Sequence, residues 1–170
     1  MGLKSWLKRR RGSDDDSTPV PAAPTEQDVL AALNRVNAML REGNAPPVVI
    51  TRVVRIARDI HETLPRIRNL GLGSMEAYSV VATATSYLPE AVGGYLRLPR
   101  EWADTRPIDG YKTSLMVLVD QLELLGSTMD KVLDAANRAD AQALLLHGKF
   151  LEAKFGQPTG GPDLTLGSPE

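Results

Sequence analysis

The sequence predicts an all-α fold: an antiparallel helical bundle of four to six helices with disordered N- and C-terminal tails. The first observation is that aliphatic side chains recur every three or four residues between positions 25 and 155, the period of an amphipathic helix. The second is that the expected connections are short, which favours antiparallel packing of neighbouring helices. The chain of 170 residues, 42% of them apolar, is long enough for one domain with tails.

Three regions are expected from this pattern. Residues 1–24 should be a basic amphipathic stub followed by a disordered linker, because positions 12–24 hold almost no large apolar side chain. Residues 25–155 should be the helical bundle domain. Residues 156–170 should be a second disordered tail, because glycine and proline are frequent there.

The first helix is expected to begin after Thr25 and to stop near Gly43. Threonine is a common N-cap, acidic residues follow in the first turn, and glycine commonly ends a helix. Its apolar stripe has a 4-3-4 spacing and consists of Val29, Leu33, Val36 and Leu40.

The second helix is expected to carry Pro46 or Pro47 in its first turn and to end or kink at Pro65. Its β-branched residues would also suit a strand, but they do not alternate with polar residues. The helical 3-4-3-4-3 spacing places its stripe at Ile50, Val53, Ala57, Ile60, Leu64 and Ile67.

Three arginines recur every three residues on this second helix, at Arg52, Arg55 and Arg58. Such a stripe could hold a phosphate, a lipid headgroup or an acidic helix. Because acidic residues are mixed with the arginines, we favour a solvated helix face paired with acidic neighbours.

The third helical segment is expected to begin with Ser74 as its N-cap. Its stripe continues past Pro89, so either one helix kinks there or a new helix begins. The stripe consists of Tyr78, Val81, Thr85, Leu88, Val92 and Tyr95.

The last segment carries an unbroken heptad stripe at Leu115, Leu118, Leu122, Leu125, Met129, Val132 and Ala136. Asp140 could cap a separate final helix that has Leu144, Leu151 and Phe155 on its inner side. Because no glycine or proline interrupts the chain near residue 139, one continuous helix is the alternative. The stripe fits an internal core as well as a dimer seam, so it leaves the oligomeric state open.

Composition excludes several classes of site and protein. The chain has no cysteine, so disulfides, thiolate nucleophiles and cysteine-ligated metals are absent. No run of eighteen apolar residues predicts a membrane-spanning helix, and we expect a cytoplasmic protein. Residues 25–170 hold fifteen basic and eighteen acidic residues, which disfavours binding to nucleic acid.

The N-terminal stub holds five basic residues and no acidic residue in its first twelve positions. On a helix its apolar and basic side chains separate, as in segments that lie on an anionic lipid surface, so weak peripheral attachment to the inner membrane face is one interpretation. A solubilising basic tail and an acidic partner are the alternatives. The candidate membrane contacts are Leu3, Lys4, Trp6, Leu7, Lys8, Arg9, Arg10 and Arg11.

An irregular stretch at residues 87–112 holds four of the eight aromatic residues of the chain, interleaved with arginines and acids. Such connectors often carry docking sites, and Trp, Tyr and Arg frequently anchor interfaces. The alternative is that the aromatic rings close one end of the bundle. The candidate partner-binding residues are Tyr87, Glu90, Tyr95, Arg97, Arg100, Trp102, Arg106 and Tyr111.

The segments "YLPEAVGGYLRLP", "DQLELL" and "HGKFLEAKFG" resemble bacterial helical proteins associated with hydrolysis of 5-bromo-4-chloroindolyl phosphate. The resemblance covers about residues 75–155 and implies a helical, envelope-associated protein, with a phosphohydrolase as a possible activity. The C-terminal "DLTLGSPE" resembles the peptides that load cargo into encapsulin shells, and it departs from their pattern at Pro169 and Glu170.

The residues themselves predict no reaction. His61 and His147 lie on different predicted helices without a second ligand at metal-binding spacing, and no phosphate loop or serine elbow is present. We therefore expect no cofactor, no metal and no catalytic residue. A non-enzymatic interaction or scaffold protein with an unidentified protein partner is the leading hypothesis, and the phosphohydrolase and the encapsulin cargo protein are the alternatives.

Overall fold

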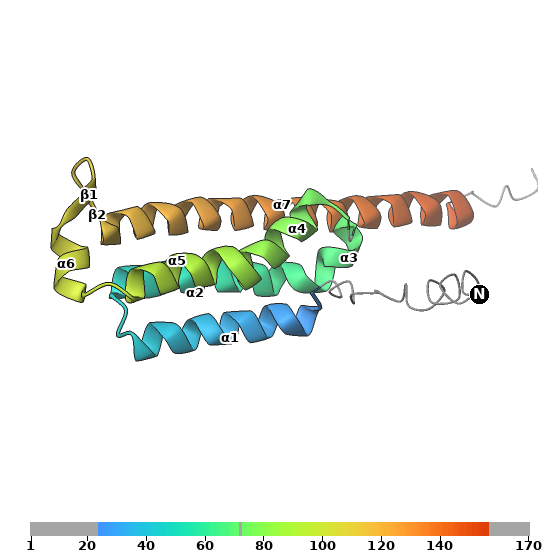
Figure 1. Cartoon of the computed structure of the whole chain (residues 1–170). Coiled ribbons are helices and arrows are strands. Elements are labelled where there is room, and N and C mark those ends of the chain that lie inside the picture. The colour runs from blue at the N-terminus through green and yellow to red at the C-terminus, as the bar shows by residue number, and fades with distance from the viewer. Residues whose placement is uncertain (1–23, 72, 157–170) are drawn as a thin grey trace, which may run out of the picture.

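The computed structural model describes residues 24–71 and 73–156, and it confirms the all-α helical bundle (Figure 1). The helices are α1 (Glu26–Glu42), α2 (Pro47–Thr63), α3 (Ile67–Leu70), α4 (Met75–Ala82), α5 (Leu88–Leu96), α6 (Arg100–Thr105) and α7 (Ser114–Phe155). Two turns join them, the 3-10 turn η2 (Leu64–Arg66) and the π-helical turn η3 (Thr83–Tyr87). The candidate membrane contacts of the stub and the encapsulin-like peptide lie outside the described residues.

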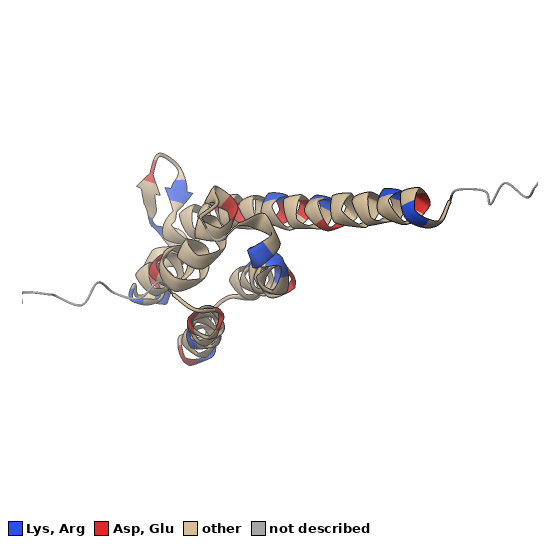
Figure 2. Cartoon of the chain, turned by 90° about the vertical axis from the view of Figure 1, so that its right-hand side faces the viewer, with Lys and Arg blue, Asp and Glu red and all other residues tan. Residues whose placement is uncertain are grey.

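The helices pack in an up-and-down order around one core. Along the chain, α1, α2, α5 and α7 alternate in direction (Figure 1). Helix α7 packs chiefly on α2, which runs in the same direction, and then on α5, while α1 packs chiefly on α5 and η3. Figure 2 shows α7 running across the other helices, with its C-terminal half projecting beyond them. The core therefore surrounds only the first part of the longest helix.

The expected helix starts are confirmed at two positions. Thr25 Oγ1 accepts a hydrogen bond from the backbone of Asp28 (3.2 Å), and the Asp28 carboxylate accepts one from the Thr25 backbone (2.7 Å). That backbone bond holds the pKa of Asp28 below its ordinary value. Ser74 caps α4 in the same way through the backbone N–H of Ala77 (3.1 Å).

The predicted stripe is confirmed in α1 and partly confirmed for the second helix. All four stripe residues of α1 are buried. In the second stripe, Val53, Ile60 and Leu64 are buried as predicted, whereas Ile50 is 38% exposed. Val49 and Ile56, which the stripe did not include, are also buried. Tyr78 of α4 is likewise 59% exposed and not part of the core. The start of α2 has apolar residues on adjacent faces of the helix. Their spacing is therefore consistent with either face being buried, and packing against the other helices determines which one is.

The structure resolves the question at Pro89 in favour of one bent helical segment. The π-helical turn η3 directly precedes α5 and joins it to α4. Pro89 has no N–H to donate, so the α-helical hydrogen-bond pattern cannot continue unchanged through the turn before it. A wider, π-helical turn at this position accommodates the missing hydrogen bond. The turn also places Tyr87 at the edge of the bundle.

A small β-hairpin was not predicted. Strand β1 (Pro107–Asp109) pairs with β2 (Lys112–Thr113) in antiparallel fashion, and Gly110 has a φ of 57° in the turn. The Asp-Gly pair is a strong signal for such a turn, because glycine adopts positive φ without steric cost. Together with α6, the hairpin closes the end of the bundle where α7 begins.

The last segment is one continuous helix, which decides between the two alternatives at Asp140. Five residues of its heptad stripe are buried, from Leu118 to Ala136. The predicted inner side of the final segment is wrong, because nothing among the described residues packs on it. There Leu144 is 73% exposed and Phe155 is 70% exposed, and Leu151 is 39% exposed.

Candidate functional site

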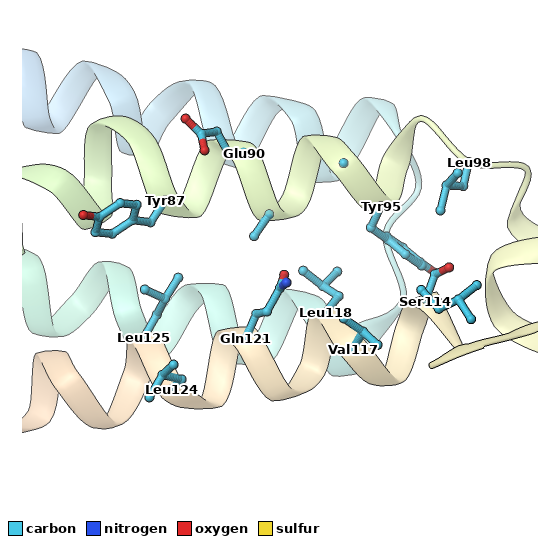
Figure 3. Close-up of a pocket in the computed structure, with 13 residues that line it drawn as sticks. Tyr87, Glu90, Tyr95, Leu98, Ser114, Val117, Leu118, Gln121, Leu124 and Leu125 are labelled. Carbon is cyan, nitrogen blue, oxygen red and sulfur yellow. The ribbon is translucent and has the colours of Figure 1, made fainter. Parts of the chain in front are cut away.

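An open groove of about 510 Å³ lies between α5 and α7 (Figure 3). One wall is formed by Tyr87, Ala91 and Tyr95 of the η3–α5 segment. Val117 and Leu124 stand on the opposite wall, which belongs to α7. The groove is mostly lined by apolar side chains, so it suits an apolar occupant better than an ionic one.

Local sequence explains why the groove stays open. Ala91 and Gly94 put small residues on the side of α5 that faces α7, and they leave space between the two helices. On α7, Val117, Gln121 and Leu124 form a second stripe beside the core stripe, with a 4-3 spacing. Leu124 is 68% exposed and Gln121 is exposed, whereas Val117 is half-buried, so the stripe is only partly covered by the described residues.

Few polar groups lie in the groove. Ser114 is 7% exposed, and its hydroxyl has no hydrogen-bond partner among the described residues. The Tyr95 hydroxyl donates to Asp104 Oδ1 (2.6 Å). Burial of the phenol, together with this bond, raises the pKa of Tyr95 to about 12. Glu90 stands at the rim and points away from α7 (Figure 3).

The structure divides the eight candidate partner-binding residues. Tyr87, Glu90 and Tyr95 line the groove. Arg100 instead joins two helices, because its Nη2 donates to the carbonyl of Gly43 (2.8 Å) and its guanidinium lies 5.1 Å from the centre of the Tyr95 ring. The remaining four are exposed on or near α6 and the hairpin without lining the groove: Arg97, Trp102, Arg106 and Tyr111.

Sequence reasoning missed the α7 wall and Ile108 of β1, which also lines the groove. The signal for the wall is present in the sequence as the second stripe at Val117, Gln121 and Leu124. A helix with stripes on two neighbouring faces contacts two layers. Ile108 carries no such signal, because its position depends on the hairpin.

A ladder of ion pairs joins α2 to α7. Arg52 Nε lies 3.5 Å from Glu123 Oε2, and Arg55 contacts both Glu123 (3.4 Å) and Asp130. The pair with Asp130 raises the pKa of Arg55. The interpretation of the arginine stripe as a helix face paired with acidic neighbours is therefore confirmed.

One carboxylate of this region is buried. Asp59 is 1% exposed, and Arg58 donates to its Oδ1 through Nη2 (2.8 Å) and Nε (3.1 Å). Its Oδ2 has no partner among the described residues. Burial raises the pKa of Asp59, and the nearby Asp130 carboxylate adds to this effect. The pKa of Asp130 is lowered, chiefly by its bond with Arg55.

No group of three or more His, Asp or Glu side chains in residues 24–71 and 73–156 could hold a metal ion. Within the same residues, no helix combines the length and the apolar character needed to cross a membrane.

Comparison with known proteins gave no match: no family model, no curated protein and no solved structure is similar to this chain.

Proposed function

We propose that the chain is a non-enzymatic helical interaction protein that binds an amphipathic helix of a protein partner in the α5–α7 groove. The observation that supports this is the groove itself, about 510 Å³ in volume and lined by apolar side chains such as Leu124. Amphipathic helices dock in such grooves through side chains at every third or fourth position. Glu90 at the rim offers a negative charge to a basic residue on the edge of the incoming helix.

A photo-crosslinking amino acid at Leu124 of the full chain tests this function in the cells that make the protein. We expect it to join the chain covalently to a distinct protein, and Val117→Glu should abolish the adduct by placing a charge in the groove. The matched position is Val54, which is 55% exposed on α2 and does not line the groove. Equal adducts at both positions, or none at Leu124, would contradict the proposal.

The N-terminal stub adds weak attachment to the inner face of the cytoplasmic membrane. Its five basic residues and Trp6 support this, because each Lys or Arg near an anionic surface contributes about 1 kcal/mol. A fluorescent fusion of the full chain should lose its peripheral signal when Trp6 and Leu7 both become Asp. Ser13→Asp with Thr18→Asp adds the same charge outside the stub and should leave the signal unchanged; an unchanged signal in both variants would refute the anchor.

A further inference from the structure

The C-terminal part of α7 is a helix without cover in the described structure. Residues 141–155 project beyond the bundle (Figures 1 and 2), and every residue except the half-buried Gly148 is exposed. Six large apolar side chains are 39–73% exposed along this stretch: Leu144, Leu145, Leu146, Phe150, Leu151 and Phe155. Large apolar side chains exposed in this number along one helix mark a contact site. We call residues 141–155 the extension.

The extension continues the pattern by which α7 packs on α2. Residues 114–140 of α7, which we call the covered half, bury Met129, Val132 and Ala136 in a 3-4 spacing. The same register continues past Ala136 through Ala139, Ala143, Leu146, Phe150 and Ala153. A second stripe runs through Leu144, Leu151 and Phe155 on another side of the helix. A helix that lies flat on a lipid surface has one apolar face, whereas apolar seams on two sides are typical of a helix packed among other helices.

We propose that the extension packs antiparallel against the extension of a second copy of this chain. Length is the first argument. The last bonds between α7 and the bundle within the described residues reach Asp140, from Arg66 Nε (2.9 Å) and Asn69 Nδ2 (3.1 Å). A two-fold axis near Gly148 places the end of the partner helix, at residue 155, opposite residue 141, where this cover stops. Each extension is then covered along its whole length by the extension of its partner.

Area is the second argument. The antiparallel register sets Leu146 of each copy against Phe150 of the other, with Ala143 facing Ala153. The second stripe, with Leu144 and Leu151, stays uncovered in this pair and packs on a further pair of extensions in a four-helix arrangement. Covering both stripes removes on the order of 1,000 Å² from water for each pair of copies, which is about the minimum for a specific interface.

Sedimentation of the full chain at tens of micromolar tests the proposal. We expect a dimer or tetramer, and Leu146→Glu with Phe150→Glu should convert it to a monomer with unchanged circular dichroism per residue. Because both side chains are more than half exposed, the double variant should not unfold the bundle. Gln142→Glu with Lys149→Glu changes charge beside the seam and should still associate.

A monomeric parent chain would overturn the proposal. So would association that the Leu146→Glu and Phe150→Glu changes leave intact. Vesicles of phosphatidylglycerol distinguish the lipid alternative: a monomer that floats with vesicles and loses this binding in the same double variant would show that lipid, not a second copy, covers the extension.

Direction is tested with cysteines, because the natural chain contains none. A mixture of the Ala143→Cys and Ala153→Cys chains should form the mixed disulfide in preference to either homodimer, since antiparallel pairing places these positions opposite each other. Preferred disulfides of each variant with itself would show parallel pairing and overturn the proposed geometry.

Discussion

The two halves of α7 carry one heptad pattern in two different surroundings. In the first half the stripe faces α2 and α5, and Leu122 is 1% exposed. In the second half the same spacing continues, yet Leu146 is 66% exposed. The comparison shows that periodicity establishes a helix and an apolar face, whereas the presence of a cover depends on where the neighbouring helices end.

The largest expected effect comes from truncating one leucine in each half. Leu122→Ala should lower the free energy of unfolding by about 2–5 kcal/mol, because it leaves a cavity in the packed core. Leu146→Ala should change it by less than about 0.5 kcal/mol in the monomer, because the side chain is already in water. Urea denaturation followed by circular dichroism at low protein concentration measures both, and equal losses would refute the distinction between the halves.

A buried carboxylate on α2, the helix that covers the first part of α7, provides a second test. Burial raises the pKa of Asp59, so the folded chain binds this proton more tightly than the unfolded chain. Its contribution to stability is complete below the ordinary carboxyl pKa and is lost as pH rises through the raised value. Asn does not titrate, so Asp59→Asn should remove this loss of stability with rising pH. We expect the loss in the parent chain to be about 1–3 kcal/mol, the cost of one unsatisfied buried polar group.

Asp130 provides the opposite sign as a control. Its pKa is lowered by Arg55, so its contribution is present above the ordinary pKa and is lost as pH falls. Urea denaturation across the acidic range should therefore show opposite changes of slope in Asp59→Asn and Asp130→Asn. Parallel curves for the two variants would contradict the assignment.

The hydrogen bond at the groove should have a smaller effect. Tyr95→Phe removes the bond to Asp104 and should cost about 1 kcal/mol. Because the pKa of Tyr95 is raised to about 12, the folded chain loses stability as pH rises from the ordinary tyrosine pKa through that value. Ultraviolet absorbance of tyrosinate should lose its most alkaline step in Tyr95→Phe and keep it in Tyr111→Phe, whose side chain is 76% exposed.

The smallest expected effect concerns the two glycines of α7. A Cβ at Gly148 would meet nothing within 4 Å, so Gly148→Ala should stabilise the extension by about 0.5–1 kcal/mol through helix propensity alone. Amide hydrogen exchange of residues 141–155 should slow. Gly126→Ala is the matched change in the covered half, where the added carbon would lie 3.6 Å from Arg55 Cζ, and it should slow exchange there instead.

The candidate groove was predictable only on one side. Tyr87, Glu90 and Tyr95 line the groove and belong to a stretch whose composition predicts a docking region. The facing residues, such as Leu124, became part of a site only because α7 lies beside α5. Arg100 shows the reverse case. Arginine is common at interfaces, but this guanidinium donates to the carbonyl of Gly43 within the same chain.

Local sequence alone specifies the helical class, the caps at Thr25 and Ser74, and the core register from Leu118 to Ala136. These features depend on local hydrogen bonds and on the 3.6-residue period, which neighbouring residues carry along the chain. Contacts between the helices determine which face of α2 is buried, where the groove opens, and how far α7 extends beyond the helices that cover it. Those outcomes depend on contacts between residues far apart in the chain, which no local spacing specifies.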